Sequence, residues 1–197
     1  MHAAAPIALI HEFYPPDSDL CRILLIHSRA VAERALQIAR RLDDEAPDLV
    51  FIEEAALLHD IGIYLTNAPA IGCRGVWPYV CHGWLGRTIL EQKGLFRHAL
   101  VCERHVGAGL SAAEIRSQGL ALPVRDMQPV SLEEQIICYA DAFFSKTPQF
   151  NGRPLPFASV AENMRAYGEE KLQRFLQWAG RFEPGFLQGF AASGDFS

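Results

Sequence analysis

The chain has 197 residues, of which 50% are hydrophobic and 21% charged, a composition typical of one globular domain with a hydrophobic core. The formal net charge of −5 argues against nucleic-acid binding by bulk electrostatics but leaves room for a local basic pocket that holds a phosphate. No apolar run approaches the roughly 20 residues that span a bilayer, and the N-terminus lacks the features of a signal peptide, so we expect a cytoplasmic protein without membrane association.

Helical periodicity accounts for the first half of the chain. The prolines and Ser18 supply a start for a helix over 20–42, in which apolar residues recur at helical spacing. Pro47-Asp48 opens a second helix that ends near His59. The glycines and prolines of 62–77 predict a loop that forms a lid or pocket wall, and two further helices are expected over 78–91 and 95–105.

The second half contains three segments with capping-box spacing, which begin at Ser111, Ser131 and Ser159. The second precedes the strongly apolar run 136–144, and the third predicts a C-terminal helix that reaches about Trp178. Three prolines mark 145–157 as a linker, and no segment shows convincing strand alternation. The pattern predicts an all-α fold, a compact helical bundle.

The five cysteines are odd in number, form no C-x-x-C motif and lie mostly in apolar stretches. This usage is typical of reduced, buried thiols in a cytosolic protein.

Polar residues within apolar helices are the main functional signal. His59-Asp60-Ile61-Gly62 closes the apolar run 52–58, and an adjacent imidazole and carboxylate can share one cation while the carboxylate bridges to a second. Asp141 lies in an apolar helix, where a carboxylate is costly to bury unless a cation or several donors satisfy it. The alternative is that Asp141 faces solvent on the polar side of the helix. The other candidate ligands are weaker when each is considered alone. An ordinary histidine of the core or of a helix end would account for His27, His82 or His105 equally well.

The order H…HD…H…H…D resembles the HD superfamily of metal-dependent hydrolases in its HDIG form, from about His27 to Asp141. The matching segments are His27-Ser28, His59-Asp60-Ile61-Gly62, His82-Gly83, Arg104-His105 and Ala140-Asp141. This resemblance implies an HD-domain helical bundle, a single domain over 1–197 with its metal-site helices at about 17–146 and a C-terminal helical cap at about 157–190.

The resemblance also implies a binuclear site for two divalent ions, of which Fe, Mn, Co, Ni, Zn and Mg are all candidates. One ion would be held by His27, His59, Asp60 and Asp141, and the other by Asp60, His82 and His105, with Asp60 as the bridge. The last three are also the candidate catalytic residues. The remaining histidines, His2, His11 and His98, are interpreted as surface or structural residues.

Two metal ions about 3.5–4 Å apart can activate a water for attack on a phosphoester. We therefore expect a phosphohydrolase that acts on a small phosphorylated substrate, and the resemblance implies a nucleotide. Arg87, Arg104 and Lys146 are candidate phosphate contacts, although each is also explained as a surface charge. The chain departs from many HDIG proteins at Ile63, where they carry a lysine, and it lacks the Gly-Tyr-Pro signature of cyclic-dinucleotide phosphodiesterases.

Two other functions fit the same ligand order. Some HD relatives hold two irons and cleave a C–C or C–P bond with dioxygen, so a di-iron oxygenase is one alternative. A non-catalytic module that senses a metal or a nucleotide is the other. The aromatic residues of the C-terminal helix predict packing on the core, with a homodimer contact or a pocket wall as alternatives.

Overall fold

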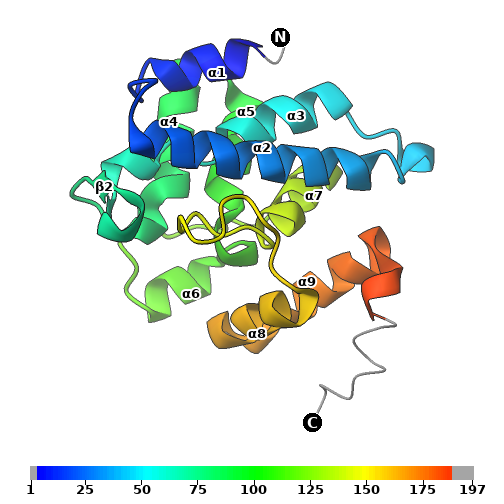
Figure 1. Ribbon diagram of the computed structural model, residues 1–197. Coiled ribbons are helices and arrows are strands. Elements are labelled where there is room, and N and C mark those ends of the chain that lie inside the picture. The colour runs from blue at the N-terminus through cyan, green and yellow to red at the C-terminus, as the bar shows by residue number, and fades with distance from the viewer. Residues whose placement is uncertain (1–3, 188–197) are drawn as a thin grey trace.

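The structure, a computed structural model, describes residues 4–187 and confirms the all-α fold (Figure 1). Its α-helices are α1 Ala4–His11, α2 Asp19–Ala39, α3 Leu49–Leu58, α4 His82–Gln92, α5 Phe96–Arg104, α6 Ala112–Ser117, α7 Leu132–Asp141, α8 Phe157–Tyr167 and α9 Glu169–Phe182. Short 3-10 turns lie between them, and among these residues no helix is long and apolar enough to cross a membrane.

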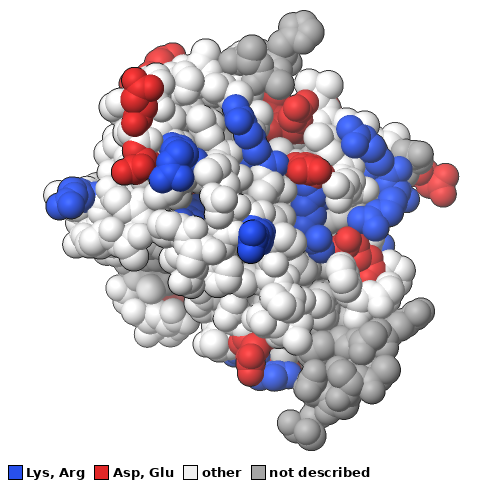
Figure 2. Space-filling view, in the orientation of Figure 1, with Lys and Arg blue, Asp and Glu red and all other residues white. Residues whose placement is uncertain are grey.

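The long helix α2 runs through the middle of the molecule and packs against α3 and α7 (Figure 1). Helices α4 and α5 form a closely packed pair, and α3 and α7 both contact α5. Helices α8 and α9 pack on each other and reach the rest of the bundle through α7 and the turn after α5. Acidic and basic side chains are interspersed on the face that Figure 2 shows.

Helix α9 closes one side of the main hydrophobic core with its aromatic side chains. The Tyr139 ring of α7 stacks on Phe175 at 5.2 Å between ring centroids and contacts Phe182 edge-on at 5.6 Å. Phe175, Trp178 and Phe182 are all buried, which confirms the predicted packing on the core for these three residues. Phe186, also predicted to pack there, is 40% exposed, and Phe190 lies outside the described residues. The five cysteines are free and buried, as the sequence predicted.

Most helix starts follow the predicted caps. The Phe51 backbone N–H donates to Asp48 at the start of α3. At α6 the Ser111 hydroxyl accepts from the Glu114 backbone N–H and the Glu114 carboxylate accepts from the Ser111 backbone N–H, which completes a capping box. Ser131 caps α7, but the Glu134 carboxylate accepts from the Val130 backbone N–H, so the reciprocal half of that capping box is absent.

Four sequence predictions were wrong in detail. Helix α8 begins at Phe157, with Pro156 at the N-cap position, where its missing backbone N–H costs the helix no hydrogen bond; Ser159 therefore lies inside the first turn. The single C-terminal helix is two helices, broken at Gly168, where φ is +135°. The loop 62–77 contains a two-residue antiparallel pair, β1 Asn67–Ala68 and β2 Cys73–Arg74. The helix over 78–91 begins as the 3-10 turn Tyr79–Cys81 and becomes α-helical at His82.

Glycines allow α4 to lie against its neighbours at unusually short range. A Cβ at Gly62 would lie 2.3 Å from the His82 carbonyl oxygen, and one at Gly83 would lie 2.4 Å from the Cys102 carbonyl oxygen. Both contacts are with backbone atoms, which cannot turn aside as a flexible side chain can. The glycine of the His59–Gly62 motif therefore fixes the start of α4 against the turn that follows α3.

Candidate metal centre

Five elements bring the six predicted ligands together. His27 lies on α2, His59 and Asp60 follow α3 directly, and His82 begins α4. His105 follows α5 and Asp141 ends α7. Helix ends are suited to this because they let side chains from different directions converge on one point. All but Asp141 are buried, and the Asp141 side chain is 18% exposed.

The first group of donor atoms is formed by His27, His59, Asp60 and Asp141. The His27 Nε2 lies 3.1 Å from Asp60 Oδ2 and 3.0 Å from Asp141 Oδ1, and the His59 Nε2 lies 3.1 and 3.3 Å from the same two atoms. Two ligand atoms that each lie roughly 2.1 Å from a shared ion, at about 90–109°, are about 3.0–3.4 Å apart. The group therefore has the spacing of the ligand shell of one ion.

The second group is formed by Asp60, His82 and His105. The Asp60 Oδ1 lies 3.3 Å from His82 Nε2 and 3.5 Å from His105 Nε2, and the two imidazole nitrogens are 3.1 Å apart. Asp60 therefore offers one carboxylate oxygen to each group, which is the arrangement of a bridging ligand.

Hydrogen bonds to backbone carbonyls fix the tautomers of three histidines. The Nδ1–H of His59 donates to the Ala56 carbonyl at 2.6 Å, that of His82 donates to Tyr79 at 2.6 Å, and that of His105 donates to Cys102 at 2.8 Å. A carbonyl only accepts, so Nδ1 carries a proton, and Nε2 faces the site, where it offers its lone pair whenever the imidazole is neutral.

The buried carboxylates fit a cation. Both oxygens of Asp60 and the Oδ1 of Asp141 accept no hydrogen bond from the described residues, although Lys146 forms an ion pair with Asp60. A buried carboxylate oxygen without a hydrogen-bond donor is unfavourable, and a neutral histidine that directs a lone pair at it, as His82 does 3.3 Å from Asp60 Oδ1, adds to the cost. A divalent ion between these atoms removes both penalties.

Burial and neighbouring charges shift the pKa values of the site's members in different directions. Burial lowers the pKa of His59, but the neighbouring Asp60 and Asp141 carboxylates outweigh it and raise the pKa to about 10. Burial lowers the pKa of His82 to about 3, which keeps that imidazole neutral. Burial raises the pKa of Asp60, yet the charges of His59 and Lys146 outweigh it and hold the pKa well below the usual value.

Of the three predicted phosphate contacts, the structure places only Lys146 at the site. Its Nζ lies 2.6 Å from Asp60 Oδ2, its side chain is 11% exposed, and it lies in the segment that follows α7. Burial lowers the pKa of Lys146, but Asp60 outweighs that effect and raises the pKa above its usual value. The ammonium group is therefore charged beside the candidate bridging carboxylate.

The two arginines lie elsewhere. Arg87 forms ion pairs with Glu91 and Glu103, and Arg104 donates to both Glu134 oxygens at 2.9 and 3.0 Å. Neither lines the cavity at the site, so we do not retain them as substrate contacts.

The other histidines lie away from the donor groups. His98 is buried on α5, 3.3 Å from a Glu54 carboxylate oxygen, and His11 is exposed on α1. His2 lies outside the described residues. Helix α1 itself was not predicted from the sequence.

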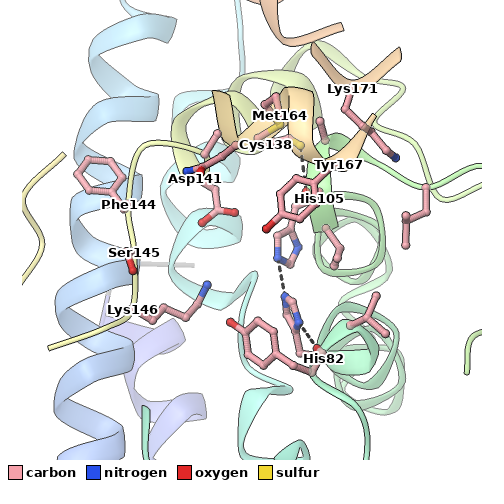
Figure 3. Close-up of a pocket in the computed structure, with 18 of the residues that line it drawn as sticks. His82, His105, Cys138, Asp141, Phe144, Ser145, Lys146, Met164, Tyr167 and Lys171 are labelled. Atoms are coloured by element: carbon pink, nitrogen blue, oxygen red, sulfur yellow. Dashed lines mark hydrogen bonds between the residues drawn. The ribbon is translucent and has the colours of Figure 1, made fainter. Parts of the chain in front are cut away.

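A cavity of about 650 Å³ opens beside the two donor groups, and His82, His105, Asp141 and Lys146 line it (Figure 3). Ala68, Ala70 and Ile71 of the predicted loop 62–77 form part of its wall. Helices α8 and α9 supply Asn163, Met164, Tyr167 and Lys171 to the lining. The sequence indicated a pocket wall only as an alternative for the C-terminal aromatic residues and did not identify these four residues. No local pattern marks these residues, since their place depends on how the C-terminal helices pack.

The model of the HD domain family matches residues 24–145, which include all six donor residues. The chain belongs to the HD domain family. Members of the HD family bind divalent metals, and the His/Asp groups described above are of that type.

Three curated relatives are also similar. A tRNA (cytidine(56)-2'-O)-methyltransferase of Picrophilus torridus is 34% identical over 140 residues, which cover 67% of this chain and 37% of that protein. An uncharacterized protein of Methanocaldococcus jannaschii is 34% identical over 118 residues, 58% of this chain and 62% of that protein.

The third is a tRNA (cytidine(56)-2'-O)-methyltransferase of Thermoplasma volcanium, 30% identical over 161 residues, 78% of this chain and 41% of that protein. The HD chain thus spans less than two thirds of the length of each relative. Among solved structures, none matches it significantly.

Proposed function

We propose that this chain is a phosphohydrolase with two divalent metal ions, which cleaves a small phosphoester or phosphoanhydride. The observation that carries the proposal is the position of Asp60. Its two carboxylate oxygens are buried, and each faces a different pair of histidine nitrogens at 3.1–3.5 Å. A carboxylate shared in this way is suited to hold two ions close together.

The six donor residues would hold the ions, His27, His59 and Asp141 on one side of Asp60 and His82 and His105 on the other. When bound, such a pair of ions supplies an activated water and polarises a phosphoryl oxygen. The protein's own part is to fix the donors through their backbone hydrogen bonds and to open them to the cavity.

The position of Lys146 supports a phosphorylated substrate rather than an uncharged one. Its ammonium group lines the cavity and lies at the site, where it can bind a non-bridging phosphoryl oxygen as negative charge develops in the transition state. The position that carries a lysine in many HDIG proteins is Ile63, which is fully buried in an apolar cluster. We propose that Lys146 supplies the cation from a different segment of the chain.

The names of two relatives do not change this proposal. They describe methyl transfer to a cytidine of tRNA by proteins of which this chain spans 37% and 41%. The proposal is based instead on the donor groups and the cavity of the chain itself.

The test is a phosphoester panel with protein that has been freed of metal and reloaded separately with Mn, Fe, Co or Mg. We expect turnover in at least one metal form. Asp60→Ala should lose both ions and all turnover, whereas His105→Ala should lose mainly one ion. Two bound irons, dioxygen consumption and no phosphoester turnover would instead indicate an oxygenase and contradict the proposal.

A further inference from the structure

We infer that the substrate carries a single phosphoryl group on a compact apolar or aromatic body, and that the cavity selects against di- and triphosphates. The inference rests on the proposed function, which names only a small phosphorylated compound. It is based on the charges and the wall of the cavity next to the metal centre.

Apart from the two proposed metal ions, the described lining of the cavity offers a substrate one cationic side chain beside the donor groups. Among its described lining residues the charged side chains are Glu114, Asp141, Lys146 and Lys171. Lys171 is buried, lies 2.9 Å from Glu114 Oε1 and donates to the Gly109 carbonyl oxygen, so its ammonium group is engaged by partners within the protein. Asp141 belongs to the donor groups. Lys146 is paired with Asp60, but that carboxylate would be engaged by the ions in the metal-loaded centre, so Lys146 is the one cationic side chain of the described lining that would become available to an anionic ligand.

A second phosphoryl group would therefore enter the cavity without a partner of its own. Sites that hold di- and triphosphates surround them with basic side chains or with the N–H groups of a glycine-rich turn at a helix start. No arginine lines this cavity within residues 4–187, and the paired Lys171 has no free charge to offer. A desolvated phosphate without a cation is costly, which makes longer phosphate chains poor ligands.

The wall beyond the donor groups is apolar. Ile71, Val80, Leu110, Leu120, Phe144 and Met164 come from six separate segments and line it together. The Tyr167 ring at the end of α8 lines the same cavity as His105 and Asp141 (Figure 3). Tyr167 is 63% exposed, which places an aromatic face at the rim, where it can stack on a planar group. At about 650 Å³ the cavity is within the usual range for a small molecule.

Two matched substrate series test the inference with the wild-type, metal-loaded chain. The first compares a nucleoside 5'-monophosphate with its di- and triphosphate, and the second compares benzyl phosphate with ribose 5-phosphate, both of which release a primary alcohol. We expect kcat/KM to fall at least about tenfold with each added phosphate and to be at least about tenfold higher for benzyl phosphate, as one lost charge partner or one buried ring predicts. Equal or better turnover of the triphosphate, or of ribose 5-phosphate, would overturn the inference and leave the proposed function standing.

The binding of non-hydrolysable phosphonates tests the inference independently of turnover. Calorimetry should show phenylphosphonate bound at least about tenfold more tightly than methylphosphonate, because only the former fills the apolar wall. Equal affinities would overturn the apolar body even if the enzyme were active. If no phosphoester is hydrolysed in any metal form, the proposed function fails, while the two phosphonates still report on the cavity.

One variant pair tests the charge argument. Tyr167→Lys adds a cation at the rim and should raise the ratio of kcat/KM for the diphosphate over that for the monophosphate. Val124→Lys adds the same charge at an exposed position outside the cavity and should leave the ratio unchanged. If both variants shift the ratio equally, net charge and not the cavity determines the preference, and the inference is wrong.

Discussion

Replacing Gly62 by alanine should weaken one metal site and spare the other. Gly62 ends the His59–Gly62 motif and lies against the first turn of α4, where His82 begins the helix. An alanine Cβ would lie 2.3 Å from the His82 carbonyl oxygen and 2.5 Å from the Gly86 backbone nitrogen. Because both are backbone atoms, α4 must move away from the turn.

The size of that movement follows from the contact. Ordinary van der Waals contact begins at 3.4 Å, so relief of the clash needs a shift of about 1.1 Å, which is 3.4 Å minus 2.3 Å. Metal–ligand distances tolerate only about 0.2 Å. His82 would therefore leave the second donor group, while His27, His59 and Asp141 lie on elements that α4 does not carry. Overpacking should also cost about 1–3 kcal/mol of unfolding free energy.

The assay is Mn²⁺ content per chain after equilibrium dialysis, with urea unfolding of the metal-free protein in parallel. Gly62→Ala should bind one tight ion where the wild type binds two. Gly185→Ala is the matched control, because its Cβ would meet no atom within 4 Å, and it should behave as wild type. Two tight ions in Gly62→Ala, with affinities like those of the wild type, would refute the view that this glycine positions His82.

Three further predictions concern the charges. Lys146→Met should keep both ions but lower kcat/KM at least about tenfold, measured as initial rates at saturating Mn²⁺; an unchanged kcat/KM would exclude a phosphoryl contact. Burial lowers the pKa of His59, but the Asp60 and Asp141 carboxylates outweigh it and raise the pKa to about 10, so metal binding at pH 8 should release close to one proton from His59 and the metal affinity should rise with pH. Calorimetry in two buffers of different ionisation heat measures the proton release, and a pH-independent affinity would contradict the prediction. Asp48→Ala should lower the unfolding free energy by about 1 kcal/mol at neutral pH, because it removes the carboxylate that accepts from the Phe51 N–H and caps α3. That hydrogen bond holds the pKa of Asp48 below 3.8, so the difference in unfolding free energy between variant and wild type should fade as the pH drops through the lowered pKa; a difference independent of pH would argue against the cap.

Local patterns in the sequence were enough to locate the helices that carry the donor residues. The apolar periodicity before His27 and around Asp141, and the capping residues Asp48 and Ser131, each act within one or two turns of a helix. They therefore predict α2, α3 and α7 closely. The break at Gly168 was missed because the helical pattern continues on both sides of it.

Ion pairs between residues far apart in the chain could not be predicted from the sequence. Lys146, Arg87 and Arg104 looked equivalent as cations near donor residues. The structure separates them, since Glu103 and Glu134 engage the two arginines while Lys146 lies at Asp60. Likewise, the apolar wall of the cavity is assembled from segments far apart in the chain, so no local signal identifies it.

The central claim is a binuclear centre that shares Asp60, and the most direct test is the number of Mn²⁺ ions bound per chain at equilibrium. The account predicts two ions for the wild type and none bound tightly by Asp60→Ala. A wild-type chain that binds no ion, or an Asp60→Ala chain that still binds two, would contradict it.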